Sequence, residues 1–302
     1  MKSRLTFLML FIGSLAACNN SKKPDPQALA AYQAEIDAWH AKRVEEVLAP
    51  NGWVNLIGLF WLQPGLNTWG SAPDNHIVFP EGTVPPSAGF FFVNNGTVTL
   101  TVEKGVDIRL GGNPISKAVI FHPDLARNPQ LEMGALRWNI IKREDKLGIR
   151  LRDLESDALK NFQGIPRFAV DPAWTLPARF EKYDSLRTIA ITNIIGQTYE
   201  QKSPGALLFR YQGRELRLDV LDGQDKYFVV FADATTGKTT YGGGRFIDVK
   251  KPDATGATHI DFNKAYNPPC VFSPHATCPL PPKQNVLPVS VTAGELNYGE
   301  QH

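Results

Sequence analysis

The chain has 302 residues, of which 43% are hydrophobic and 21% are charged, a composition that supports one large domain or two smaller ones with a hydrophobic core. Its 32 basic and 30 acidic residues give a formal net charge of +2 and are mixed along the chain, so no basic stripe argues for nucleic-acid binding. The 25 glycines, 23 prolines and 10% aromatic residues favour a β-rich chain with many turns.

Residues 1–17 are typical of an export signal that is removed from the mature protein. They carry two basic residues, then an apolar run, then small residues. The apolar run is shorter than the ~20 residues that a membrane-spanning helix needs. Residues 15–18 read LAAC and resemble the lipobox of bacterial lipoproteins, which implies cleavage before Cys18 and attachment of a diacylglyceryl group to its sulfur. The alternative is an ordinary signal peptide that happens to end in a cysteine.

A lipidated Cys18 places the protein in the cell envelope, where the membrane is its partner through the lipid anchor. Asn19 follows the cysteine, and by resemblance to the sorting rule of enteric bacteria this residue favours the outer membrane. Residues 18–27 are polar and small and are predicted to form a tether between the bilayer and the folded part.

One helix is predicted over residues 28–50. Asp25 and Pro26 are typical of an N-cap followed by proline at the first helical position. Apolar residues then recur at helical spacing and predict a packing face; they include Leu29, Tyr32, Ile36, Trp39, Val47 and Leu48.

From Trp53 onward the hydrophobic period changes from helical to two. Alternating runs separated by turn residues predict a first β module over residues 53–152 and a second over residues 153–295, followed by a tail over residues 296–302. The stretch 153–184 is proline-rich and less periodic, which suits a boundary between modules. We therefore expect an all-β protein of two packed β-sandwich or barrel-like modules with one N-terminal helix.

The first module resembles the layout of a forkhead-associated β-sandwich. The resemblance rests on four short segments, residues 62–65, 70–71, 74–77 and 112–113. In that family an arginine follows the glycine of the second segment and a serine precedes a histidine in a later loop. Here Ser71 stands in the place of the arginine, and residues 87–89 contain no histidine. The resemblance implies a β-sandwich shape without the groups that read phosphothreonine.

The segment that closes the chain resembles a bacterial family catalogued as domain of unknown function 1684. The matching motifs are DFN at 261–263, AYNPPC at 265–270, CP at 278–279, PP at 281–282, AGE at 293–295, GLFWL at 58–62, FQGI at 162–165 and TTYGGGR at 239–245. They extend over most of the mature chain. The resemblance implies no established activity.

Cys270 and Cys278 remain once Cys18 is lipidated. They are separated by seven residues in a proline-rich loop of an exported chain, and this compartment and spacing favour a disulfide. One alternative makes Cys270 a nucleophile with His275 as its base. Another makes Cys270, His275 and Cys278 metal ligands, with His259 or Asp261 as the fourth, although the short knuckles of zinc sites are absent.

Tyr241 and Arg245 flank three consecutive glycines, residues 242–244, and this backbone permits close approach of a ligand or of another chain segment. Arg245 is expected either to pair with a carboxylate of the protein, with Asp261 as the candidate, or to hold an anionic ligand. Arg150 and Arg152 lie two residues apart and therefore on one face of a strand, which faces either water or a cavity.

Two hypotheses of function follow. The first is a module that binds a polar ligand, either a small anion or a glycan, through Tyr241, Arg245, Asp261, Asn263, Arg150 and Arg152. The second is an exported hydrolase with Asp261 as base and with Tyr241 or Arg245 stabilising developing charge. No cofactor, metal or nucleic acid is predicted, and the sequence does not identify any protein partner. The first hypothesis is favoured, because no complete set of nucleophile, base and orienting group can be assigned.

Overall fold

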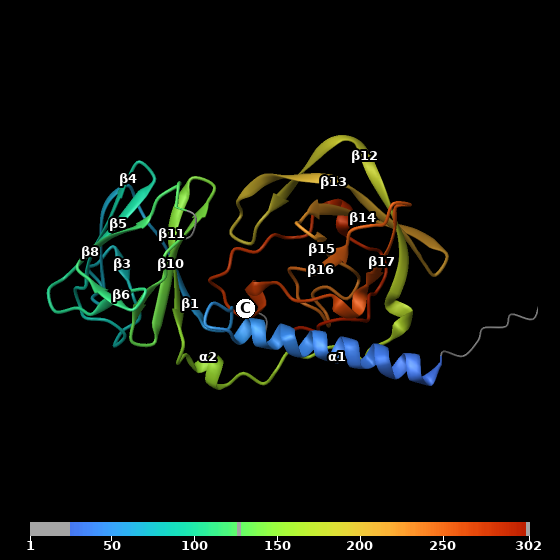
Figure 1. Cartoon of the computed structure of the whole chain (residues 1–302), viewed down its shortest axis with the longest axis horizontal. Helices are drawn as coiled ribbons and strands as arrows, with labels where there is room; N and C mark the ends of the chain where they lie inside the picture. The colour runs from blue at the N-terminus through green and yellow to red at the C-terminus, as the bar shows by residue number, and fades with distance from the viewer. Residues whose placement is uncertain (1–24, 126–127, 300–302) are drawn as a thin grey trace, which may run out of the picture.

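The computed structural model describes residues 25–125 and 128–299 and contains two β units and one long helix (Figure 1). The prediction of an all-β protein with one N-terminal helix is confirmed. The predicted signal segment, Cys18 and most of the predicted tether lie outside the described residues. No helix within the described ranges combines the length and apolar character needed to span a bilayer.

Helix α1, Pro26–Leu48, runs along one side of the second β unit (Figure 1). The side chain of Asp25 accepts a hydrogen bond from the Gln27 amide at 3.0 Å and caps the helix, as the sequence predicts. Beyond the C-terminal end, the carbonyl of Val47 accepts a hydrogen bond from the amide of Trp53 at 3.0 Å. This turn leads directly into the first β unit.

The first unit is a sandwich of two sheets with the strand orders β1-β11-β10-β9-β6-β7 and β3-β2-β4-β5-β8. Its core is centred on Trp69, Phe79 and Trp138, whose ring centroids are 5.2 to 5.8 Å apart. The strands are β1 Leu56–Trp61, β2 Gly65–Gly70, β3 Ile77–Val78, β4 Gly89–Asn94, β5 Thr97–Val102, β6 Ile108–Leu110, β7 Asn113–Ile115, β8 Lys117–Phe121, β9 Leu131–Met133, β10 Leu136–Arg143 and β11 Lys146–Asp153.

The second unit is one six-stranded sheet in the order β16-β15-β14-β13-β12-β17. The end strands β16 and β17 contact each other, so the sheet is a nearly closed barrel around Phe262, which packs on Trp174, Phe209 and Phe231. The strands are β12 Thr175–Thr192, β13 Thr198–Tyr211, β14 Arg214–Asp222, β15 Lys226–Phe231, β16 Arg245–Lys250 and β17 Ala257–Asp261. The short helices are α2 Asp157–Lys160, η1 Pro172–Trp174, η2 Phe262–Lys264, η3 Pro269–Val271 and η4 Lys283–Asn285.

The stretch 153–184 is irregular only as far as Trp174. From Thr175 onward it is the first half of the long strand β12, which pairs with β13 on one side and β17 on the other. Pro177 has no backbone N–H to donate to a neighbouring strand. For this reason the sequence around it indicates a loop. Strand β17 was likewise not predicted.

A closing segment, residues 262–299, follows β17 and crosses the second unit as coil and short 3-10 turns. It is anchored by Arg245, whose side chain is fully buried. The guanidinium donates from Nη2 to Asp233 Oδ2 and to the carbonyl oxygen of Val291, both at 2.9 Å, and from Nη1 to the carbonyl of Ala293 at 2.5 Å. The expectation of an internal ion pair for Arg245 therefore holds, but its partner is Asp233 and the proposed pairing with Asp261 is wrong.

Cys270 and Cys278 form a disulfide, with Cα atoms 6.1 Å apart, as predicted. The loop they close touches both units, and on the second unit the amide of Ile194 donates to the carbonyl of Cys278 at 2.9 Å. Ser273 Oγ donates to the carbonyl of Leu56 in β1 at 2.6 Å, and Thr277 Oγ1 accepts a hydrogen bond from Arg143 in β10 at 3.0 Å. Because both sulfurs are engaged, neither the nucleophile nor the metal alternative applies to these cysteines.

We predict that reducing the Cys270–Cys278 disulfide, or replacing both cysteines by serine, lowers the free energy of unfolding by about 2.5 kcal/mol. The reason is that the closed loop restricts the unfolded chain. Urea denaturation of oxidised and reduced protein measures the difference, after alkylation confirms no free thiol at either position before reduction. Equal stability of the two forms would contradict the role assigned to the loop.

We also predict that Asp233→Asn lowers the free energy of unfolding by about 3–5 kcal/mol, because it leaves the Arg245 charge buried without a counter-ion. Asp222→Asn is the matched control. It removes a surface ion pair with Lys251, at 2.9 Å and with the Asp222 side chain 58% exposed, and should cost less than about 1 kcal/mol. Similar midpoints of urea denaturation for both variants would show that Arg245 does not anchor the segment.

Candidate ligand-binding pocket

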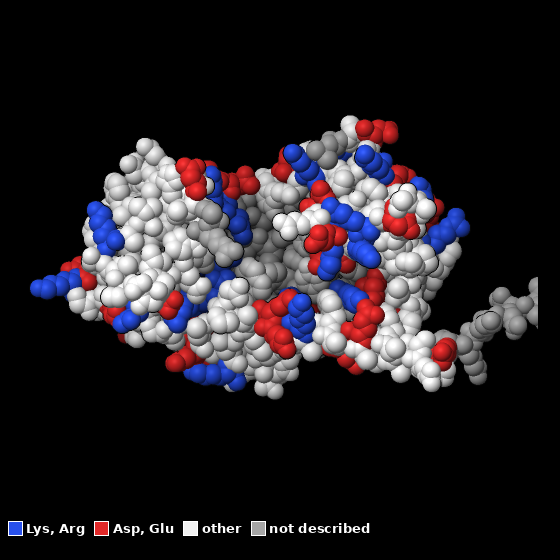
Figure 2. All heavy atoms as spheres, viewed as in Figure 1, with Lys and Arg blue, Asp and Glu red and all other residues white. Residues whose placement is uncertain are grey.

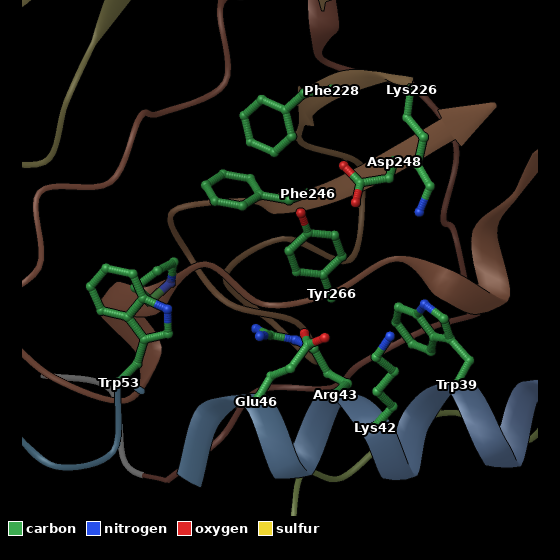
Figure 3. Close-up of a pocket in the computed structure, with 11 residues that line it drawn as sticks. Trp39, Lys42, Arg43, Glu46, Trp53, Lys226, Phe228, Phe246, Asp248 and Tyr266 are labelled. Carbon is green, nitrogen blue, oxygen red and sulfur yellow. The ribbon is translucent and has the colours of Figure 1, made fainter. Parts of the chain in front are cut away.

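A pocket of about 440 Å³ lies between α1 and the outer face of strands β15 and β16 (Figure 3). We call it the α1 pocket. Its lining combines large aromatic side chains with side chains of both charges. The lining residues are Trp39, Lys42, Arg43, Glu46, Trp53, Lys226, Phe228, Phe246, Asp248, Tyr266 and Pro269.

One wall of the α1 pocket comes from a single face of the helix. Trp39, Lys42, Arg43 and Glu46 are spaced by three, four and seven residues, which places them on the same side of α1. All four point from the helix toward the strands in Figure 3. This face was not predicted as a ligand site, although Trp39 was predicted to lie on a packing face.

The opposite wall comes from the barrel surface. Phe228 in β15 stands directly opposite Asp248 in β16, and Phe246 lies two residues before Asp248, so these side chains share one face of the sheet. Phe246 packs edge-on against Phe228 at 4.9 Å and against Tyr266 at 5.8 Å. The rings make a rigid aromatic floor.

The polar groups of the α1 pocket are open to a ligand. Within the described ranges, Lys42, Glu46 and Lys226 form no ion pair, and all three side chains are exposed. The Asp248 carboxylate faces the Tyr266 hydroxyl in Figure 3. The neighbouring side chains partly shield the Asp248 carboxylate from water, and this raises its pKa. The positive charge of Lys226 acts in the opposite direction. Burial, together with the charge of Asp248, raises the pKa of Tyr266.

Arg43 positions α1 rather than facing the pocket with a free charge. Its Nη2 donates to the carbonyl of Asn267 at 2.9 Å, and its Nε lies 3.5 Å from Oε1 of Glu295. The guanidinium also lies 4.9 Å from the centre of the Tyr266 ring. These contacts tie the helix to the closing segment.

Asp261 and Asn263, both predicted to bind ligand, instead hold the turn after β17. Asp261 Oδ1 accepts hydrogen bonds from the hydroxyl of Tyr32 at 2.8 Å and from the amide of Asn263 at 3.1 Å. The Asn263 side chain is buried, donates to the carbonyl of Asp171 at 2.8 Å and accepts from its amide at 3.0 Å. Both residues therefore dock α1 and η1 onto the barrel.

Tyr241 is half-buried against the disulfide loop, and burial raises the pKa of its hydroxyl. The glycines beside it serve the protein's own packing. Gly244 has φ +80°, and a Cβ at that position would collide with Pro281 of the closing segment and with the carbonyl oxygen of Phe231. The close approach that the three glycines predict is therefore made by another chain segment.

Arg150 and Arg152 lie in β11, on the face of the first unit that is turned toward the second. The six predicted ligand residues thus fall into separate places: Arg245 within the second unit, Asp261 and Asn263 under α1, Tyr241 beside the disulfide loop, and the two arginines in β11. Among the residues that the structure describes, no group of three or more His, Cys, Asp or Glu side chains is placed to hold a metal ion.

Glu295 is fully buried in the closing segment, and burial raises the pKa of its carboxyl to about 7, against the opposing effects of Arg43 and the Asn267 amide. Between about pH 4.3, the pKa of a glutamate in the unfolded chain, and about pH 7, the folded protein therefore keeps a proton on Glu295 that the unfolded chain has released. The contribution of Glu295 to the free energy of unfolding is thus most favourable below about pH 4.3 and falls as the pH rises to about 7.

We predict that the melting temperature of Glu295→Gln, relative to the unsubstituted protein, is higher at pH 8 than at pH 5. The amide cannot ionise and so escapes the penalty that the carboxylate acquires. Comparing both proteins at each pH cancels the titration of other groups, such as His40. A difference that stays constant between the two pH values, or that changes in the other direction, would contradict the assignment.

The chain was compared with curated proteins, solved structures and protein families. No curated protein matches the chain. An uncharacterized protein of Haloarcula marismortui, solved in solution by NMR, is 29% identical; the match covers 45% of this chain and 78% of that one, with a TM-score of 0.39. The FHA domain of FhaA, solved with the intracellular domain of Rv3910, is 14% identical over 31% of this chain and 97% of its own, with a TM-score of 0.22.

Residues 160–296 match the family model described as Protein of unknown function (DUF1684). The matched range contains the barrel, the disulfide loop and most of the closing segment, whereas the GLFWL motif at 58–62 lies outside it. Over residues 160–296, the chain is therefore similar to this family of unknown function.

Proposed function

We propose that the protein is a lipid-anchored cell-envelope protein that binds a small glycan in the α1 pocket. The observation that carries the proposal is the combination, in one cavity, of aromatic rings with exposed polar groups of both charges. The volume of about 440 Å³ falls within the range of small-molecule sites, which span ~300–1,000 Å³.

A sugar suits this lining for two chemical reasons. Its C–H faces pack against aromatic rings, which the pocket supplies through Trp39, Phe246 and Tyr266. Its hydroxyl groups both donate and accept hydrogen bonds, so the same ligand satisfies a carboxylate such as Asp248 and an ammonium such as Lys226. A small anion is less suited, because it would pair with a lysine of the pocket but offer no hydrogen-bond donor to Glu46 or Asp248.

The lipid anchor at Cys18 and the outer-membrane location remain part of the proposal and rest on the sequence of residues 1–19. With Cys18 in the bilayer, the eight residues that lead to Pro26 would span at most about 28 Å. The start of α1 would then be close to the membrane surface, within reach of envelope glycans.

The alternative of an exported hydrolase with Asp261 as base gains no support from the geometry. The Asp261 carboxylate accepts hydrogen bonds from the Tyr32 hydroxyl and the Asn263 amide and lies 3.6 Å from Lys264 Nζ. These contacts give Asp261 a role in holding the turn after β17, and it does not line the α1 pocket.

We predict that a panel of neutral mono- and oligosaccharides contains a ligand that quenches tryptophan fluorescence, since Trp39 and Trp53 line the pocket. Trp39→Ala should weaken its binding by about tenfold or more, and Asp248→Asn should also weaken it, because each removes part of the contact surface.

Phe92→Ala is the matched control, because this ring is 44% exposed in the first unit and remote from the pocket. Isothermal titration calorimetry gives the dissociation constants. The proposal fails if no saccharide binds, or if Trp39→Ala binds as the control does.

A further inference from the structure

Three arginines of the β10–β11 hairpin lie on the first unit where it meets the second. Arg150 and Arg152 occupy alternate positions of β11, while Ile149 and Leu151 between and beside them point into the core of the first unit. Arg143 ends β10 and donates a hydrogen bond to Thr277 of the disulfide loop. Figure 2 shows a hollow between the two units that basic side chains of the first unit border.

Arg150 is buried without a counter-ion. It is 8% exposed, its Nε is buried with no hydrogen-bond partner, and its guanidinium forms no hydrogen bond or ion pair with any residue that the structure describes. The guanidinium instead stacks over Trp53, 4.9 Å from the ring. Burial and the positive charges of Arg143 and Arg152 lower the pKa of Arg150 to about 10.

The two neighbours have neutral partners only. Arg152 donates to the carbonyl of Gly52 at 3.1 Å and to Asn139 Oδ1 at 3.3 Å, and Arg143 donates to Thr277 Oγ1 at 3.0 Å. Neither forms an ion pair within the described ranges, so three positive charges gather without a balancing carboxylate.

This arrangement differs from that of most other arginines. Of the ten others that the structure describes, eight form ion pairs, and the two that do not, Arg187 and Arg214, are exposed. Buried arginines are normally paired, because a desolvated charge without a partner costs free energy. A buried arginine that has no ion pair and has other arginines beside it is expected where a bound anion supplies the missing negative charge.

We propose that Arg143, Arg150 and Arg152 form a binding site for a phosphate group between the two β units. A tetrahedral oxyanion accepts several hydrogen bonds from guanidinium groups, and its negative charge offsets much of the positive charge of the three arginines. The site goes beyond the proposed glycan binding and does not depend on it. Trp53, which lines the α1 pocket on one side and covers Arg150, places the two sites next to each other.

Inorganic phosphate is the first probe, applied to the purified full chain against chloride at equal ionic strength. Phosphate should raise the melting temperature, and Arg150→Gln should weaken phosphate binding by about tenfold or more. Without phosphate, Arg150→Gln should melt at a higher temperature than the unsubstituted protein, because the uncompensated charge is gone. An arginine with a purely structural role would give the opposite sign.

Arg210→Gln is the matched control: its side chain is 78% exposed in the second unit, and neither readout should change. Trp39→Ala should leave the phosphate response intact, which separates a failure of this site from a failure of glycan binding. The proposal is overturned if phosphate stabilises no more than chloride, if Arg150→Gln binds phosphate equally well, or if that variant is destabilised without phosphate.

Two further probes distinguish the sources of the phosphate group. A hexose phosphate tests a soluble phosphorylated sugar, and vesicles of phosphatidylglycerol in phosphatidylcholine test a lipid headgroup. Binding to either that is tighter than to inorganic phosphate, and that is weakened by Arg150→Gln, supports the site and names its source. Binding of inorganic phosphate alone assigns the site to free phosphate.

Discussion

The buried guanidinium of Arg245 is the contact on which the second unit and everything attached to it depend. It joins Asp233, just beyond β15, to the backbone carbonyls of Val291 and Ala293 in the closing segment. That segment is largely without regular secondary structure, so its backbone groups need partners other than strand neighbours. A charged donor inside the protein fixes several of them at once, where its hydrogen bonds are strongest.

The candidate ligand site is built on this anchor. The closing segment carries Asn267 and Glu295, which hold Arg43, and so it sets where α1 lies against the barrel. A second attachment near the start of the helix runs through Tyr32 and Asp261. Because α1 supplies one wall of the pocket and the barrel the other, the cavity is a product of tertiary assembly rather than of a local motif. Lys42, Glu46 and Lys226, which line the pocket, form no ion pair with any described residue, as is common where binding is the purpose.

Local features of the fold could be predicted from the sequence. Asp25 and Pro26 give the start of α1, alternating runs give most strands, and the export signal with the spacing of Cys270 and Cys278 gives the disulfide. The predictions that failed concerned contacts between residues that are far apart in the sequence. Asp233 is near Arg245 because β15 and β16 pair with Phe231 opposite Arg245, and the sequence offers no means of preferring that carboxylate over Asp261.

The pocket was missed for a similar reason. Trp39 and Asp248 are some two hundred residues apart, and only the docking of α1 brings them to one cavity. The sequence of the helix could have indicated the pocket. Lys42, Arg43 and Glu46 lie on the same face as Trp39, and a face that only packs against the protein core would be apolar. Arg150 and Arg152 were correctly placed on one strand face, but that they lack carboxylate partners is visible only in three dimensions.

The most direct test of this account is amide hydrogen exchange, followed by mass spectrometry, in the unsubstituted protein and in Arg43→Met. The substitution keeps an unbranched apolar stem and removes the Arg43 contacts with the closing segment, while those of Tyr32 and Glu35 near the start of the helix remain. The account predicts faster exchange in residues 36–48 of α1 and around Asn267, with β4 and β5 of the first unit unchanged. Unchanged protection of residues 36–48 would contradict it, because this part of the helix would then be held, and the pocket formed, without the contacts of Arg43.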